Sequence, residues 1–228
     1  MGLVWFVGKE DEMKKLVFVI ATISSLLLIG CGSDVNRVTD PSTTPPNSPS
    51  ASAGNVEYQK GILTDKNWES RFLDLRFTMP SGYVMATESE VRGMMEIAAD
   101  VVNIDYSKLS TVYEMMATSF PSGHPNVIVM VEKLSLSNMT IEQYVAALKI
   151  QLSSITTMTY SFSSDLTDVT IAGHVYKQFS AECQANGMTI LQNIILRKID
   201  NRVAGLIVSY TESTKSEMEI LMKGFSKY

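Results

Sequence analysis

Apolar and polar residues alternate along much of the chain after residue 56, and this pattern predicts β-strands that bury one face. From Arg71 to Thr78, leucines and a phenylalanine at every second position are separated by charged residues. Five further strands are expected at Val112–Ser119, Asn126–Leu134, His174–Gln184, Met188–Ile199 and Arg202–Thr211. Asn186-Gly187 is a strong hairpin signal, and Asp200-Asn201 joins the last two strands in a similar way.

Three other segments show the period of an amphipathic helix. The first begins at Thr87–Glu90, which has the pattern of a capping box, and the second begins at Thr140–Gln143. The third follows Ser213. Each segment has one apolar stripe and one polar face, so each helix packs against a neighbour by one side only. Helices inserted between hairpins predict an α+β domain in which one antiparallel sheet carries helices on both faces.

The order of these elements, with the Phe77–Tyr83 turn before the first helix, resembles the PsbP/Mog-type α/β/α sandwich. The resemblance covers about residues 57–228. It implies a domain whose relatives act mainly as binding and assembly factors rather than as enzymes. No motif in the chain defines site residues that can be carried over from that family.

The N-terminal part follows a different pattern. Lys14 and Lys15 precede an apolar stretch, Leu16–Ile29, which ends at Gly30 and Cys31. As a helix this stretch would be about 21 Å long, which is short for about 30 Å of hydrocarbon and typical of a signal peptide. The run resembles the lipobox of bacterial lipoproteins. An uncleaved membrane anchor is the alternative interpretation.

The lipobox resemblance implies that Cys31 receives a diacylglycerol and becomes the N-terminus of the mature chain. Acyl chains such as palmitate on that cysteine would hold the protein to the bacterial cell membrane, outside the cytoplasm, and a pair of chains anchors stably. The acidic residues Glu10, Asp11 and Glu12 do not suit a signal peptide, whose start is short and basic. We therefore expect translation to begin at Met13.

The chain divides into three parts: a signal peptide at 1–30, a tether at 31–55 and one folded domain at 56–228. The tether is rich in serine, threonine and proline and has few side chains large enough to bury, so we expect it to remain disordered. Fully extended, it would reach roughly 70–80 Å.

Composition excludes some functions. The net charge is −5, and removal of residues 1–30 takes away three basic and three acidic side chains, which leaves it unchanged. Nucleic-acid binding needs a basic surface, so we expect no nucleic-acid partner. Lipidation of Cys31 would leave Cys183 without a partner for a disulfide within the chain.

The sequence contains no catalytic pattern that we would defend. His124 lies in a hairpin loop and His174 at the start of a strand, without the local spacing of metal ligands. Cys183 has no neighbouring histidine, which favours a buried structural thiol. Asp165 and Asp168 lack the spacing of an EF-hand loop. We therefore expect no metal, no cofactor and no catalytic site.

Three side chains are candidates for ligand contacts: Trp68, Tyr83 and His124. Trp68 and Tyr83 flank the first strand, and if exposed they would offer an aromatic surface to a glycan or peptide; if buried, they would belong to the core. The fourteen methionines fall largely on predicted packing faces, where plain core packing and a methionine-lined groove are both compatible with the pattern.

These observations favour a lipid-anchored, extracytoplasmic accessory or assembly factor, expected to be a monomer, that binds another protein or a glycan without catalysis. Two alternatives remain open. A small-ligand carrier would need an apolar cavity, and a hydrolase would need a cleft that unites a histidine with a carboxylate and a hydroxyl or thiol.

Overall fold

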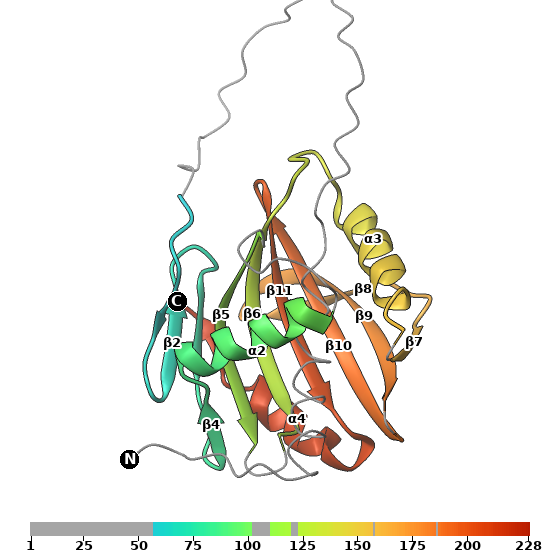
Figure 1. Cartoon of the computed structure of the whole chain (residues 1–228). Coiled ribbons are helices and arrows are strands. Elements are labelled where there is room, and N and C mark those ends of the chain that lie inside the picture. The colour runs from blue at the N-terminus through green and yellow to red at the C-terminus, as the bar shows by residue number, and fades with distance from the viewer. Residues whose placement is uncertain (1–56, 102–109, 120–122, 157, 186) are drawn as a thin grey trace, which may run out of the picture.

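Two antiparallel β-sheets form the body of the protein (Figure 1). The computed structural model describes residues 57–101, 110–119, 123–156, 158–185 and 187–228. The proposed signal peptide, its start at Met13, the lipidation site Cys31 and the tether all lie outside these residues. None of the helices formed by the described residues is long and apolar enough to cross a membrane.

The larger sheet has the strand order β4-β5-β6-β11-β10-β9-β7, and β8 also pairs with β9. Hairpins connect β5 to β6, β9 to β10 and β10 to β11, and every pairing is antiparallel. Its strands are β4 (Tyr83–Met85), β5 (Thr111–Ser119), β6 (Asn126–Lys133), β7 (Thr159–Phe162), β8 (Thr167–Ile171), β9 (His174–Ala185), β10 (Met188–Ile199) and β11 (Arg202–Tyr210).

The smaller sheet joins the two ends of the domain. Its order is β1-β2-β3-β12, from β1 (Ile62–Leu63), β2 (Asn67–Ser70), β3 (Leu75–Thr78) and β12 (Phe225–Lys227). Phe225 pairs with Phe77, almost 150 residues earlier in the chain. This sheet packs across one face of the larger sheet, where Phe77 and Trp68 are completely buried.

The helices α2 (Glu88–Val101) and α3 (Ile141–Ser153) cover the opposite face of the larger sheet, as Figure 1 shows. The short α4 (Lys215–Met222), preceded by the 3₁₀ turn η2 (Glu212–Thr214), lies beside the smaller sheet on the other face. Capping boxes begin α2 and α3, since Thr87 and Glu90 exchange hydrogen bonds, as do Thr140 and Gln143. Each such cap stabilises its helix by about 1 kcal/mol.

The prediction of an α/β/α sandwich with helices on both faces was wrong. Among the described residues the structure is mostly β, since its strands hold about twice as many residues as the helices α2, α3 and α4. A second sheet with the single short helix α4 covers the face where a layer of helices was expected. The sequence did not reveal this sheet because its strands have only two to four residues, too few for a clear alternation.

The individual elements were predicted better than their layers. The hairpin strands agree with prediction to within one or two residues, and α2, α3 and α4 begin at or near the predicted caps. The expected strand Arg71–Thr78 is correct only from Leu75, because residues 71–74 form a turn in which Asp74 has a φ of 52°. The short strands β1, β2, β4, β7, β8 and β12 were missed.

Both hydrophobic cores are built from residues between Tyr58 and Phe225. One lies between the larger sheet and the helices α2 and α3, and the other between the two sheets. Full burial of a large apolar side chain contributes about 1.5–3 kcal/mol, so these two layers supply the driving force for folding. A chain that begins in the tether therefore keeps every core contact described here.

Candidate functional site

A buried carboxyl group, Glu114 in β5, lies where β5 is irregular. The pairing of β5 with β6 shifts between Tyr113 and Met115, so Glu114 is the extra residue of a β-bulge. Tyr113 packs in the helix-side core and Met115 in the core between the sheets. A bulge redirects one side chain, and here it turns the Glu114 carboxyl toward the smaller sheet, where only 1% of the residue is exposed.

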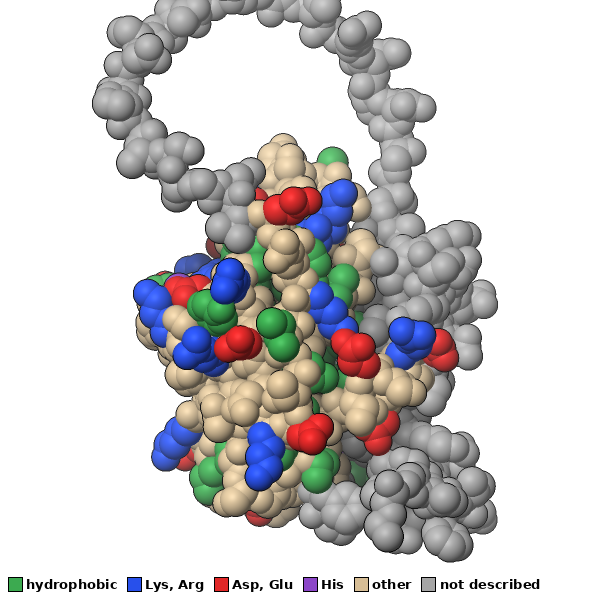
Figure 2. All heavy atoms as spheres, turned by 90° about the vertical axis from the view of Figure 1, so that its left-hand side faces the viewer, with side chains coloured by type: hydrophobic (Ala, Val, Ile, Leu, Met, Phe, Trp, Pro, Cys, Tyr) green, Lys and Arg blue, Asp and Glu red, His purple; other side chains and the backbone are tan. Residues whose placement is uncertain are grey.

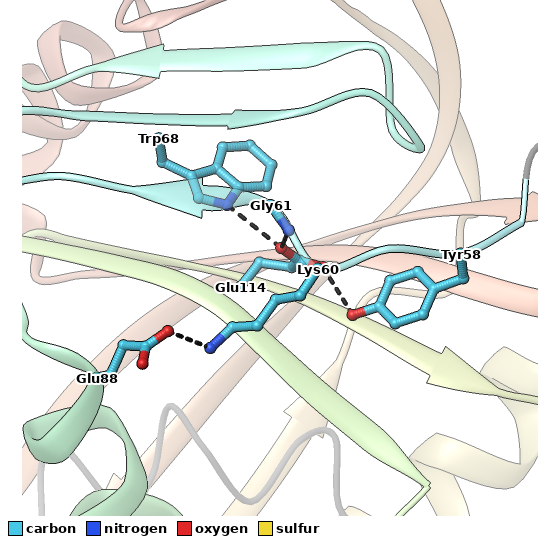
Figure 3. Close-up of polar contacts among 6 residues, drawn as sticks. All are labelled: Tyr58, Lys60, Gly61, Trp68, Glu88 and Glu114. Carbon is cyan, nitrogen blue, oxygen red and sulfur yellow. Dashed lines mark hydrogen bonds and ion pairs between the residues drawn. The ribbon is translucent and has the colours of Figure 1, made fainter.

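Three hydrogen-bond donors surround this carboxyl (Figure 3). The Tyr58 hydroxyl donates to Oε1 at 2.8 Å, the Gly61 amide to Oε2 at 2.6 Å, and the Trp68 indole N–H to Oε2 at 3.3 Å. All three donors come from the first described residues of the domain. We call Tyr58, Gly61, Trp68 and Glu114 the Glu114 cluster.

Glycine is required at position 61. A Cβ there would lie 2.5 Å from Trp68 Nε1 and 2.8 Å from Glu114 Oε2, which is too close for any real contact. The absence of a side chain lets the backbone amide reach the carboxyl directly. The sequence therefore sets two features of this contact. The acceptor Glu114 lies at a bulge, and the donor Gly61 has no side chain that would keep its amide away from the carboxyl.

Burial raises the pKa of the Glu114 carboxyl, and the hydrogen bonds from Gly61, Tyr58 and Trp68 act against this rise. Burial and the nearby Glu114 charge also raise the pKa of the Tyr58 hydroxyl, so it remains a donor. The Arg202 guanidinium lies 4.2 Å from the centre of the Tyr58 ring, and this cation–π contact also holds the ring in place.

An exposed ion pair adjoins this cluster. Lys60 Nζ lies 2.7 Å from Glu88 Oε1 at the start of α2, and the two side chains are 41% and 64% exposed. Figure 3 shows Lys60 reaching from the N-terminal segment to the helix. An exposed pair adds at most about 1 kcal/mol, so the buried Glu114 cluster, rather than this pair, holds the segment in place.

The arrangement fixes the start of the domain to the larger sheet. The donors on Tyr58 and Gly61 lie just after the proposed tether, and their acceptor lies in the larger sheet. Hydrogen bonds to a charged group are worth about 1.5–3 kcal/mol each, and loss of the acceptor would leave buried donors unpaired. The Glu114 cluster therefore holds the first described residues of the domain against the larger sheet.

The three predicted ligand-contact residues lie in separate surroundings. Trp68 is completely buried in the Glu114 cluster, so it belongs to the core and offers no exposed aromatic surface. The hydroxyl of the half-buried Tyr83 donates to the Glu217 carbonyl at 2.8 Å and ties β4 to α4. His124 is 4% exposed, and burial lowers its pKa to about 4, so its ring is neutral near pH 7.

His124 adjoins a buried polar row that crosses four strands. Thr118, Asn126, Ser209 and Gln192 are neighbours in register, and at most 7% of any of them is exposed. The Asn126 amide donates to the Gly123 carbonyl, and the Gln192 amide donates to the Ser209 hydroxyl. The sequence gives a signal for this row only as isolated polar residues in otherwise apolar strands.

A second buried carboxyl, Glu132 in β6, faces the helices. The Tyr144 hydroxyl of α3 donates to it at 2.7 Å and the Ser110 hydroxyl at 3.4 Å. Burial raises its pKa to about 7, although both hydrogen bonds lower it. Glu114 and Glu132 were both missed, and the available signal was an acidic residue inside a strand of valines and methionines.

The remaining candidates for chemistry are structural. Cys183 is completely buried, and burial raises the pKa of its thiol to about 11. His174 Nε2 lies 3.1 Å from Asp74 Oδ2. Among the described residues, no group of three or more histidine, cysteine, aspartate or glutamate side chains is placed to hold a metal ion.

Comparison with known proteins yields only distant structural similarity. No family model and no curated protein matches the chain. The PsbP protein of Synechocystis sp. PCC 6803 is 13% identical, with a TM-score of 0.46 over 78% of this chain and 98% of that one. LpqN of Mycobacterium tuberculosis, described as involved in cell envelope biogenesis, is 12% identical, with a TM-score of 0.42 over 67% and 82%.

A structure from Bacteroides thetaiotaomicron is 11% identical, with a TM-score of 0.41 over 73% of this chain and 49% of that one. The first of these three structures is described as a cyanobacterial PsbP. Their TM-scores all lie below 0.5, so we transfer no function from them.

Proposed function

We propose that the chain is an extracytoplasmic lipoprotein that is anchored to a membrane through Cys31 and carries a non-catalytic domain for binding or assembly. The observation that carries this proposal is the sequence around Cys31, a short apolar segment that begins after two lysines and ends in Leu28-Ile29-Gly30-Cys31. The domain would bind a protein or glycan outside the cytoplasm.

The Glu114 cluster supports a tethered role. A domain held by a flexible tether experiences any pull at its first ordered residues. Here those residues, Tyr58 and Gly61, are bound to a buried carboxyl of the larger sheet. A pull from the anchor would therefore act on the core of the domain rather than peel off its first strand.

Two alternatives have less support. The hydrolase hypothesis needs a histidine that meets a carboxylate and a nucleophile. His174 meets Asp74, but no hydroxyl or thiol is found among the polar contacts of His174 in the described residues. The carrier hypothesis needs an apolar cavity lined by methionines and aromatic side chains, whereas Trp68, one of the aromatic candidates, is completely buried in the core and donates to Glu114.

Metabolic labelling with a fatty-acid analogue tests the anchor. The chain has only two cysteines, so Cys183→Ala is a matched control for Cys31→Ala. We expect label on the wild type and on Cys183→Ala, and none on Cys31→Ala. Equal labelling of wild type and Cys31→Ala would refute lipidation. Crosslinking in intact cells, followed by pulldown of the mature lipoprotein, then tests for an extracytoplasmic partner.

A further inference from the structure

Most charged side chains of this domain lie in solvent. Figure 2 shows acidic and basic side chains interspersed over the side of the molecule that carries the smaller sheet. Two carboxyls are buried instead, and one of them, Glu132 of β6, lies between the larger sheet and α3, where only 1% of the residue is exposed. A buried group that gains a charge weakens the packing around it, because the charged form needs water or a partner.

The helix α3 is held to the larger sheet by side chains alone, because the backbone hydrogen bonds of a helix are made within the helix. Its inner face carries five buried side chains: Ile141, Tyr144, Val145, Leu148 and Leu152. The strand β6, in contrast, is paired with β5 on one side and with β11 on the other. A change at the contact between β6 and α3 therefore acts first on α3.

Tyr144 is the one polar side chain among these five, and it bonds to Glu132. Its hydroxyl donates to one carboxyl oxygen at 2.7 Å, and the Ser110 hydroxyl donates to the other at 3.4 Å. Tyr113 of β5 packs in the same core, whereas Glu142, the acidic residue of α3, is exposed. A carboxylate accepts up to about four hydrogen bonds, so two hydroxyls replace only part of the water that the charged form would hold.

The cations near Glu132 in the described part of the chain are engaged elsewhere. Lys133 and Arg202 pair beside it but point to the opposite face of the sheet, where Arg202 makes its cation–π contact. Lys198 follows two strands along the same row, and its ammonium donates to the Ser137 carbonyl at 2.7 Å. Ionised Glu132 therefore lacks a balancing cation among these residues.

Other contacts of α3 do not involve Glu132. Lys149 Nζ donates to the Ser163 carbonyl at 2.8 Å and lies 5.0 Å from the centre of the Phe179 ring. The capping box at Thr140 stabilises the start of the helix. These contacts keep α3 formed and close to the sheet when its inner face opens.

The size of the response follows from the two environments of the carboxyl. Burial raises the pKa of Glu132 from the usual 4.5 to about 7, and an opening that returns the group to water restores the lower value. The closed state is favoured while Glu132 is protonated, and this advantage is lost as the pH rises through 7. The equilibrium constant for such an opening therefore rises about 70-fold between pH 5 and pH 8.

We propose that α3 is a pH-controlled cover of the core between the helices and the larger sheet: protonated Glu132 holds it closed, and ionisation of Glu132 loosens it. Loosening exposes the apolar inner face of α3 and the core beneath it. The use of this response rests on the proposed function, because a domain outside the cytoplasm meets the pH of its surroundings directly. The opening itself is a property of the domain and does not depend on Cys31.

A thiol on the inner face of α3 tests the opening. The chain from Gly32 to Tyr228 lacks Cys31 and keeps both cores, and Cys183→Ala removes its remaining cysteine. Val145→Cys then places a single thiol beside Tyr144 on the buried face of the helix. Its rate of reaction with a thiol reagent reports how often this face is open to solvent.

The same chain with Glu132→Gln is the reference, because glutamine cannot ionise. Comparison of the two proteins at one pH cancels the ionisation of the thiol itself. We expect the ratio of their reaction rates to rise about 70-fold between pH 5 and pH 8. A ratio that changes by less than about threefold would overturn the proposal.

A thiol in the other core separates opening of α3 from unfolding of the whole domain. Val208→Cys, in the Cys183→Ala chain, lies between the two sheets at a completely buried position. At pH 8, 1 M urea should speed the reaction at position 208 by about 30-fold, because that thiol is reached by global unfolding. The same urea should change the reaction at position 145 by less than about threefold, and equal acceleration of both would overturn the proposal.

Glu132→Leu provides a second variant without an ionisable group, in case glutamine disturbs the fold. It should abolish the pH response as Glu132→Gln does, and a response that persists in either variant would overturn the proposal. The experiment does not involve lipidation, so its failure leaves the anchor at Cys31 untouched. Loss of labelling at Cys31 would likewise refute the anchor and leave the opening of α3 standing.

Discussion

The buried carboxyl of Glu132 makes a specific prediction about stability and pH. The group is 1% exposed, and burial raises its pKa from the usual 4.5 to about 7. We expect the wild type to lose stability as the pH rises from 5 to 8, and Glu132→Gln to lose much less. Glutamine keeps the acceptor for the Tyr144 hydroxyl but has no proton to release.

The sign follows from where the proton binds more tightly. With a pKa of about 7 in the folded state and 4.5 in the unfolded state, Glu132 favours folding while it is protonated. This contribution is complete below pH 4.5 and is lost as the pH rises through 7. Between pH 5 and pH 8 the loss amounts to about 2.5 kcal/mol, at 1.36 kcal/mol for each pKa unit.

Urea denaturation at a series of pH values measures the effect. With a denaturant slope of about 2 kcal/mol per M, the midpoint of the wild type should fall by about 1 M more than that of Glu132→Gln between pH 5 and 8. Glu114, whose pKa is also raised, contributes with the same sign in both proteins. The difference between the pH dependence of the wild-type midpoint and that of the Glu132→Gln midpoint therefore isolates Glu132.

Glu219→Gln makes the same chemical change on an exposed residue of α4 and should follow the wild type. Tyr144→Phe removes a hydrogen bond that lowers the folded-state pKa of Glu132, so its loss of stability should begin near the same pH as in the wild type and continue to higher pH. If wild type and Glu132→Gln show the same pH dependence within about 0.5 kcal/mol, the reasoning from burial is refuted.

Three further predictions concern the core. Gly61→Ala should cost about 2 kcal/mol or more, because its Cβ meets Trp68 and Glu114, whereas Gly93→Ala, with open space around it, should stabilise α2 by about 0.5–1 kcal/mol; equal effects in urea denaturation would contradict the contacts. Trp68→Phe should cost about 1–3 kcal/mol through the lost donor to Glu114, and an unchanged midpoint would exclude that bond. Cys183 should react with a thiol reagent at least about 100-fold faster in urea than in the native state, and rapid native reaction would show an accessible thiol.

Local signals in the sequence predicted local structure well. The alternation and the turn residues near Gly187 predicted the β9–β10 hairpin, and the two capping boxes predicted where α2 and α3 begin. These features depend on residues close together in the chain. Pairing of Phe225 with Phe77 joins distant segments, and no local pattern specifies it, so the second sheet was missed and helices were placed on its face.

The polar sites were harder to predict for a related reason. Trp68 was singled out as a residue type, but whether it is exposed depends on the sheet that covers it. Glu114 points toward that sheet only because a bulge shifts the register of β5 by one residue. Alternation alone does not reveal a bulge, although a glutamate next to two methionines marks the place where the alternation fails.

The two buried carboxyls share a common design. Glu114 and Glu132 lie in neighbouring strands and face opposite sides of the larger sheet. Each accepts a hydrogen bond from a tyrosine in the layer that covers its face, Tyr58 for Glu114 and Tyr144 for Glu132. Burial of a carboxyl opposes folding when the group is charged, so an apolar side chain at either position would fill the core with a smaller free-energy penalty.

Their hydrogen bonds instead specify geometry. Apolar packing tolerates small shifts of a helix or a strand, whereas a hydroxyl within 2.8 Å of a buried oxygen does not. The carboxyls therefore fix α3 on one face and the N-terminal segment on the other at single positions.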